Sequence, residues 1–251
     1  IREYTVAYEL FQKQKYATAQ ERFGKALEHR RSLPSIEQEN AEFFSANCGL
    51  ELFNKDGEYM MNTFIADHPE HPKVNEANFH LGKYYFTKKM YKAVTEWFEK
   101  VDPEKLDEKY LEEFNFKKGY AYFEQNDFDK AQNAFTQVVS GKKYRSPALY
   151  YNSYIYYSEG NNEAALAGFK ELENDPLFGK VVPFYILQIY YRQGKNEEVI
   201  SYGEGLLKKD FAEKKSGEIH RMLGEAHFNL GNFDKAVPEL ERAISELGGN
   251  R

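Results

Sequence analysis

The chain has 251 residues, of which 34 are Lys or Arg, 40 are Asp or Glu and one is Cys, an ordinary globular composition that is neither disordered nor fibrous. A single cysteine excludes an internal disulfide, and a net charge of −6 without a basic tail or stripe argues against nucleic acid as a partner. The most apolar run, Val181 to Tyr191, is interrupted by Gln188 and is about half the roughly 20 residues that a membrane-spanning helix needs, so we expect no such helix.

A pattern with a period of about 34–38 residues runs along the whole chain. In each period a small residue is followed four positions later by an apolar one. The clearest pairs are Ala19 and Phe23, Val94 and Phe98, Ala131 and Phe135, Ala165 and Phe169, and Ala236 and Leu240. Apolar residues within each half of the period are three or four positions apart, which predicts helices rather than strands.

Turn residues separate the two helices expected in each period: Asn126, Gly160, Gly194 and Gly231 stand at this point. Glycine there supplies the left-handed conformation that ends one helix and lets the next begin. The sequence therefore predicts helical hairpins over 1–33, 36–70, 73–102, 107–141, 146–175, 180–210 and 215–247, which we number as repeats one to seven. Because the chain begins at Ile1 rather than Met, we expect it to be part of a longer protein.

Three of these repeats carry the residues of a known family. They read Leu81-Gly82…Tyr85…Tyr91…Val94…Phe98, then Gly119…Tyr122…Phe128…Ala131…Phe135, and last Leu223-Gly224…Gly231…Phe233…Ala236…Leu240. In these positions the chain resembles the tetratricopeptide repeat proteins, over essentially its whole length; repeat two departs most, at Ser45, Cys48, Leu52 and Gly57. The resemblance implies an all-α, right-handed superhelical solenoid of about seven repeats, forming a single domain over 1–251.

In this family the first helices of successive repeats line a concave surface, and the resemblance assigns three positions of each first helix to it. Most of these positions are aromatic here, in a chain with 20 Tyr and 20 Phe. Phe116, Tyr120 and Phe123, for example, have the spacing of one helical stripe. An aromatic stripe is more often core than site, and that interpretation stands beside the groove hypothesis. The candidate groove residues are Tyr8, Phe79, Lys83, Phe86, Phe116, Tyr120, Phe123, Tyr150, Tyr154, Tyr157, Phe184, Tyr191 and Arg221.

The groove hypothesis predicts a non-catalytic scaffold that binds a peptide segment or partner protein. Some tetratricopeptide repeat proteins grip a C-terminal carboxylate with Lys, Asn and Arg, but only Lys83 and Arg221 are basic here, several repeats apart. An apolar extended or helical segment is therefore the expected partner, and a glycan stacked on the rings is the other ligand class. The alternative is a segment of a longer array that self-associates through its uncapped terminal helices, its groove filled by its own chain.

No pattern in the sequence predicts catalysis, a metal or a cofactor. His68 and His71 are close together, but the prolines beside them place both in a turn between repeats, and no third ligand is indicated. Cys48 falls at a mid-helix core position, which favours an inert buried thiol. Gly203-Glu-Gly205 lacks the preceding strand that a phosphate-binding loop requires. We therefore expect that the protein is not an enzyme.

The border between repeats two and three resembles that of bacterial cell-envelope tetratricopeptide repeat proteins, the outer-membrane-assembly lipoprotein and the Tol-associated type. The stretch from Phe64 to Pro72 is followed by Asn75-Glu-Ala-Asn-Phe-His-Leu-Gly82. This short resemblance implies a bacterial protein of the periplasm or the outer membrane.

Overall fold

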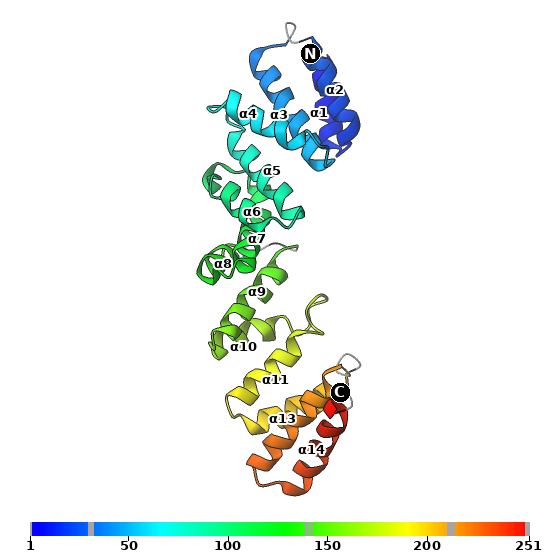
Figure 1. The fold of residues 1–251 in the computed structure, drawn as a ribbon, viewed down its shortest axis with the longest axis vertical. Helices are drawn as coiled ribbons and strands as arrows, with labels where there is room; N and C mark the ends of the chain where they lie inside the picture. Colours follow the sequence, from blue (N-terminus) through cyan, green and yellow to red (C-terminus); the bar gives the residue numbers. More distant parts are fainter. Residues whose placement is uncertain (1, 30–32, 139–140, 142, 210–213, 249–251) are drawn as a thin grey trace. The chain divides into compact units, whose positions relative to one another are not determined.

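The computed structural model describes residues 2–29, 33–138, 141, 143–209 and 214–248 (Figure 1). The chain divides into two compact units, residues 1–137 and 138–251, which we call the N-terminal and the C-terminal unit. The helices of the N-terminal unit are α1 (Arg2–Gln12), α2 (Tyr16–Glu28), α3 (Ser35–Glu51), α4 (Gly57–Asp67), α5 (Val74–Thr87), α6 (Tyr91–Phe98), the 3₁₀ helix η2 (Pro103–Lys105), α7 (Glu108–Glu124) and α8 (Phe128–Phe135). Those of the C-terminal unit are α9 (Arg145–Ser158), α10 (Asn162–Glu171), α11 (Val182–Arg192), α12 (Asn196–Leu207), α13 (Ser216–Asn229) and α14 (Phe233–Gly248).

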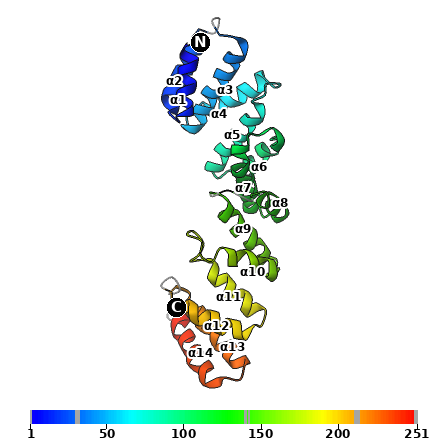
Figure 2. The same ribbon diagram turned by 180° about the vertical axis from the view of Figure 1, so that it is seen from behind.

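The fold is all-α, as predicted, and the described residues contain no strand. Each helix packs on the next in the chain to form hairpins, and α2 packs on α3, α4 on α5 and α6 on α7 to join the hairpins of the N-terminal unit. In the C-terminal unit α10 packs on α11, and α12 on α13 (Figure 2). Stacking of hairpins in chain order is the arrangement of a helical solenoid, in which each repeat buries its apolar face against its neighbours. That the whole of 1–251 acts as one domain stays a prediction.

A residue in the left-handed conformation closes each of the seven hairpins. Four of these residues are the predicted ones: φ is +60° at Asn126, +80° at Gly160, +66° at Gly194 and +77° at Gly231. In the first three hairpins the same position is held by residues that the sequence did not mark as turns, Gln14, Phe53 and Lys89, with φ between 55° and 57°. The backbone at these three residues adopts a conformation that costs a non-glycine residue about 1–2 kcal/mol.

Close packing inside a hairpin depends on a small residue opposite a large one. A Cβ atom added to Gly119 would lie 2.7 Å from the Phe135 ring, and one added to Gly224 would lie 2.6 Å from Leu240. Repeat six has the reverse order: the first helix carries Leu187 and the second carries Gly203, whose added Cβ would lie 3.4 Å from Leu187. The hairpin is thus closed in either order, provided that one partner is small.

Two further features of the N-terminal unit agree with the sequence. Cys48 is fully buried on α3, as expected, and burial raises the pKa of its thiol to about 12. Trp97, the chain's one tryptophan, lies on α6 with the ammonium group of Lys100 3.8 Å from its ring centroid. Among the helices described in both units, none has the length and apolar character of a membrane span.

Candidate interaction surface

Aromatic side chains on α5 and α7 form a connected group on the N-terminal unit. Tyr120 is its centre: its ring centroid lies 5.6 Å from that of Phe86, 6.2 Å from Phe116 and 6.3 Å from Phe123. All four rings are half-buried, so each contacts its neighbours and still presents part of its surface to solvent. The 3.6-residue period of α7 places three of them on one stripe of that helix. We call these four residues the Tyr120 cluster.

Two other aromatic candidates of this unit lie apart from the cluster. Phe79 is fully buried and stacks on the Phe98 ring at 6.0 Å, so the structure makes it a core residue that no ligand can reach in this arrangement. Tyr8 is 36% exposed on α1, with its ring 5.0 Å from that of Phe44. Sequence spacing alone could not separate these two cases, because burial depends on which helix covers the ring.

The aromatic candidates of the C-terminal unit come from α9 and α11. Tyr150, Tyr154, Phe184 and Tyr191 are half-buried, whereas Tyr157 is only 9% exposed. The Tyr157 hydroxyl donates a hydrogen bond of 2.8 Å to Gln188 Oε1, joining the two helices. We call the four half-buried residues the C-terminal aromatic set.

A loop outside the repeat pattern covers part of this set. Phe178, between α10 and α11, stacks on Tyr150 with ring centroids 4.4 Å apart. Burial is the main cause that raises the pKa of Tyr150 above its ordinary value, with Tyr185 adding to it. The repeat pattern gives no signal for Phe178, because the segments that connect one hairpin to the next are not part of the helical apolar period.

The two basic candidates are both neutralised by a carboxylate. Lys83 Nζ lies 2.6 Å from Glu51 Oε1, and Arg221 Nη1 lies 2.8 Å from Glu225 Oε1. Burial lowers the pKa of Lys83, but the ion pair with Glu51 outweighs this effect and the net shift is upward. The Arg221 guanidinium also lies 5.4 Å from the Tyr191 ring, whose hydroxyl donates to Glu225. Neither cation is therefore available without breaking an existing pair.

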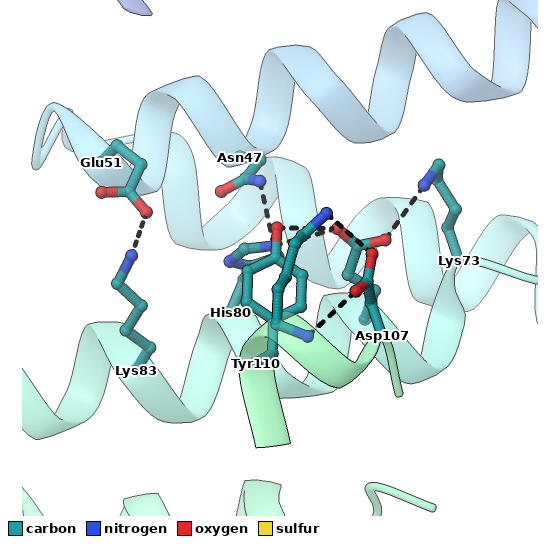
Figure 3. A network of polar contacts seen from close by, with 9 residues as sticks. Asn47, Glu51, Lys73, His80, Lys83, Asp107 and Tyr110 are labelled. Atoms are coloured by element: carbon teal, nitrogen blue, oxygen red, sulfur yellow. Dashed lines mark hydrogen bonds and ion pairs between the residues drawn. The ribbon is translucent and has the colours of Figure 1, made fainter. Parts of the chain in front are cut away.

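A polar network that the sequence analysis missed crosses from α3 through α5 to the start of α7 (Figure 3). His80 Nε2 lies 3.1 Å from Asn47 Nδ2 and 3.4 Å from Glu76 Oε1. Glu76 also receives a hydrogen bond of 3.0 Å from Lys73 Nζ and one of 3.4 Å from the hydroxyl of Tyr110. Asn47 and His80 are buried, so their contacts hold the three helices together rather than facing a ligand.

Glu76 is the charged centre of this network. Burial raises the pKa of its carboxyl, but the hydrogen bond and charge of His80, together with Lys73, outweigh burial and hold the pKa at about 2. Glu76 therefore stays ionised under ordinary conditions and ties α5 to its neighbours through charge-assisted bonds. Two of its partners, Lys73 and His80, stand three and four residues away in the sequence, and only Tyr110 comes from another helix, α7.

His68 and His71, which stand close together in the sequence, each lie beside a carboxylate. His68 and His71 lie between α4 and α5, as predicted; His68 Nε2 is 2.8 Å from Glu42 Oε2, and His71 Nε2 is 3.7 Å from Glu39 Oε2. In the part of the chain that the structure describes, no three His, Cys, Asp or Glu side chains are grouped so as to hold a metal ion.

The last helix carries a second apolar face. Phe233, Val237, Ile244 and Leu247 are between 46% and 71% exposed, with Ile244 the most exposed. Phe233, Val237 and Ile244 lie on one stripe of α14 that differs from the buried positions Ala236 and Ala243, whereas Leu247 faces α13, where a Cβ added to Gly217 would lie 2.9 Å from Leu247. This is the face on which a further helix would stack in a helical array.

Comparison with known proteins bears on the fold. The sequence matches the tetratricopeptide repeat family over residues 116–177 and 186–250, which together are just over half of the chain. Among solved structures it is similar to the C-terminal part of a TPR repeat-containing protein from Cytophaga hutchinsonii, with 16% identity, 99% of this chain and 96% of that chain covered, and a TM-score of 0.59. A tetratricopeptide repeat protein from Parabacteroides merdae ATCC 43184 has 12% identity, coverage of 98% and 94%, and a TM-score of 0.53.

MamA from MSR-1 is also similar, with 14% identity, 71% of this chain and 99% of that chain covered, and a TM-score of 0.56. Likeness at these identities concerns the fold alone. No curated protein matches the sequence. The finer resemblance to cell-envelope proteins, and with it the location in the periplasm or outer membrane, stays a prediction.

Proposed function

The chain belongs to the tetratricopeptide repeat family, and we propose that it is a scaffold that binds an apolar peptide segment of a partner protein on its half-buried aromatic side chains. Proteins of this family are generally non-catalytic and serve protein–protein interaction. We propose the same for this chain, without a cofactor and without nucleic acid as a partner. The proposed surfaces are the Tyr120 cluster and Tyr8 on the N-terminal unit, and the C-terminal aromatic set on the C-terminal unit, each taken by itself.

The observation that supports this proposal is the partial burial of the Tyr120 cluster. Aromatic rings that serve only as core are buried, as Phe79 is. Partly exposed rings with no binding function would seldom lie together on one stripe of a helix. Tyr120 instead lies within 6.3 Å of several half-buried rings, among them those of Phe86, Phe116 and Phe123. Aromatic side chains that are held by neighbours yet partly open lose little entropy on binding, which is why they are common at interaction surfaces.

The charges favour an apolar segment over a C-terminal carboxylate. Lys83 and Arg221 are engaged by Glu51 and Glu225, so a carboxylate ligand would first have to displace an existing partner. Tyrosine hydroxyls then supply the polar contacts, and ring faces supply the area.

Substitution of the central ring in each unit tests the proposal. We would prepare Tyr120→Ala, Tyr154→Ala and the double variant, and measure retention of an immobilised peptide library together with helicity by circular dichroism. Tyr59→Ala is the matched control, because Tyr59 is 73% exposed on α4, away from the cluster. Loss of a peptide class in the ring variants but not in the control supports the proposal. Unchanged retention in the double variant, or retention of glycans alone, contradicts it.

The exposed face of α14 favours a second candidate function, self-association through the terminal helix. Ile244 is 71% exposed and Val237 is 54% exposed, in a chain whose other large apolar residues are mostly covered. Ile244→Glu with Val237→Glu should then abolish any increase of mass with concentration in sedimentation measurements. A wild-type chain that stays monomeric over the whole concentration range rules this candidate out.

A further inference from the structure

The C-terminal unit contains a cleft that the repeat pattern does not predict. It has a volume of about 860 Å³ and lies between α12 and the loop of residues 173–180, with Tyr190 of α11 at its base. Figure 2 shows α12 and α11 beside this loop. The volume is within the range of about 300–1,000 Å³ that small ligand sites occupy.

The cleft lies on a different face of α11 from the C-terminal aromatic set. Tyr190 lines the cleft, whereas its neighbour in the chain, Tyr191, belongs to the aromatic set. Consecutive residues of an α-helix point about 100° apart. The ring of Tyr190 instead packs at 5.9 Å against Tyr202 of α12, whose hydroxyl donates 2.7 Å to Glu173.

Two carboxylates that line the cleft are engaged within the fold: Glu173 accepts from the Tyr202 hydroxyl, and Asp175 accepts from the backbone N–H groups of Leu177 and Phe178. The other four charged side chains are separated along the length of the cleft. The added Cβ of Gly203 would lie 3.4 Å from Leu187, which sets the antiparallel register of α11 and α12. Glu197 and Glu198 at the start of α12 are therefore near the end of α11, and Lys209 is near its start, as is Lys180 in the loop before it. All four side chains lack an ion pair or hydrogen bond to any described residue.

The floor between these two ends is open. Gly205 lines the cleft in the interior of α12, and a Cβ atom added there would meet nothing within 4 Å. Packing therefore does not require this glycine, although glycine destabilises a helix relative to alanine. At this position the missing side chain leaves room for the backbone of another chain to approach the helix closely.

We propose that the cleft binds an extended peptide segment of a partner protein, with a basic side chain at the Glu197 and Glu198 end and an acidic side chain at the Lys180 and Lys209 end. From residue 197 to residue 209 a helix rises about 18 Å. An extended chain covers that length with about five or six residues at 3.3 Å each. Tyr202 and Gly205 face the middle of the segment. This site is separate from the proposed aromatic surface and does not depend on it.

A library of N-acetylated, C-amidated hexapeptides tests the proposal with the complete 251-residue chain. Positions one and six are Glu, Lys or Ser, and the four positions between them are randomised. Peptides with Glu at one end and Lys at the other, in one of the two orders, should be retained about fivefold more strongly than those with Ser at both ends, the gain that two exposed ion pairs provide. No preference for opposite charges at the two ends would overturn the proposal.

Charge reversal separates this site from a general attraction to charged peptides. Glu197→Lys with Glu198→Lys should select Glu at both ends, and Lys180→Glu with Lys209→Glu should select Lys at both ends. A selected set that does not change in these variants contradicts the proposal. The variant Tyr120→Ala with Tyr154→Ala should keep this retention, so failure of the aromatic surface and failure of the cleft remain distinguishable.

A large side chain in place of Gly205, which would fill the middle of the cleft, provides the last test of the peptide site. Gly205→Leu should lose retention of the opposite-charge hexapeptides while raising the thermal midpoint by about 2–3 °C through better helix propensity. Gly24→Leu is the matched control, because Gly24 lies inside α2 of the N-terminal unit and its added Cβ would also meet nothing within 4 Å. It should raise the midpoint and keep retention. Full retention by Gly205→Leu would place the peptides elsewhere and overturn the proposal.

Discussion

A Cβ atom at position 82 would lie 2.2 Å from Cε1 of Phe98, a ring that is fully buried. This contact sets how closely α5 and α6 approach. Gly82→Ala should therefore lower the free energy of unfolding by about 1–3 kcal/mol, because overpacking outweighs the gain in helix propensity. Urea denaturation followed by Trp97 fluorescence measures this in the same unit. Gly24→Ala, where the added Cβ is free, should raise the free energy of unfolding by about 0.5–1 kcal/mol.

Left-handed residues at the hairpin turns predict opposite effects of two substitutions. Lys89 has φ of 57°, a conformation in which its Cβ is strained. Glycine has no Cβ, so Lys89→Gly should raise the free energy of unfolding by about 0.5–1 kcal/mol. Gly160 has φ of 80°, and Gly160→Ala should lower it by about 1 kcal/mol. Circular dichroism during urea denaturation reports both. Equal effects of the same sign would contradict the assignment.

The depressed pKa of Glu76 predicts a loss of stability in acid. Its folded pKa of about 2 is below the unfolded value of 4.5, so its contribution is complete above pH 4.5 and falls as the pH decreases toward 2. The contribution is on the order of 2 kcal/mol for this largely covered carboxylate. Glu76→Gln should be less stable than wild type at pH 7 and about equally stable at pH 2. A constant difference over this range would show that charge is not the cause.

Burial of Cys48 predicts an unreactive thiol. With a pKa of about 12 and no exposed surface, the side chain is neither ionised nor accessible at pH 8. A thiol reagent should modify no cysteine in the native chain and one in 6 M guanidinium chloride. Rapid modification of the native chain would show that α3 opens far more often than its packing indicates.

Much of the fold follows from the sequence because the repeats are regular. Periodic apolar residues mark the helices, and glycines mark the last three turns. The first three turns are harder to predict, since Gln14, Phe53 and Lys89 have no preference for a left-handed conformation; tertiary packing imposes it. Repeat six aligned weakly for a related reason: with Leu187 and Gly203 in reverse order, its small residue falls on the other helix.

The sequence pattern gives the helical positions of the candidate residues but not how deeply each is buried. Helical spacing places Phe79 and Phe86 on one side of α5, but the first is core and the second is half-buried. That difference depends on neighbours from other helices, which spacing does not contain. Phe178 lies in a segment that connects two hairpins, outside the helical period, so the period does not predict the ring that stacks on Tyr150. Lys73 and His80 stand three and four residues from Glu76 in the sequence, but its third partner, Tyr110 of α7, is 34 residues away, and helical spacing does not predict that contact.

In repeat six the large residue lies on the first helix and the small residue on the second, the reverse of the usual order. The helices of this repeat therefore cannot be exchanged one for one with those of another repeat. If α11 were joined to a second helix of the usual kind, Leu187 would meet a large side chain, and if α12 followed a usual first helix, Gly203 would meet another small one. The first combination clashes and the second leaves a void. Gene rearrangements that exchange single helices between repeats should therefore fail. Exchange of this whole hairpin should also disturb packing, because a Cβ added to Gly203 would lie still closer, at 2.9 Å, to Leu223 of α13. During folding, a non-native pair of helices with this mismatch would be less stable than the native pair. The sizes of Leu187 and Gly203 therefore favour the pairing of α11 with α12, although every repeat has the same period.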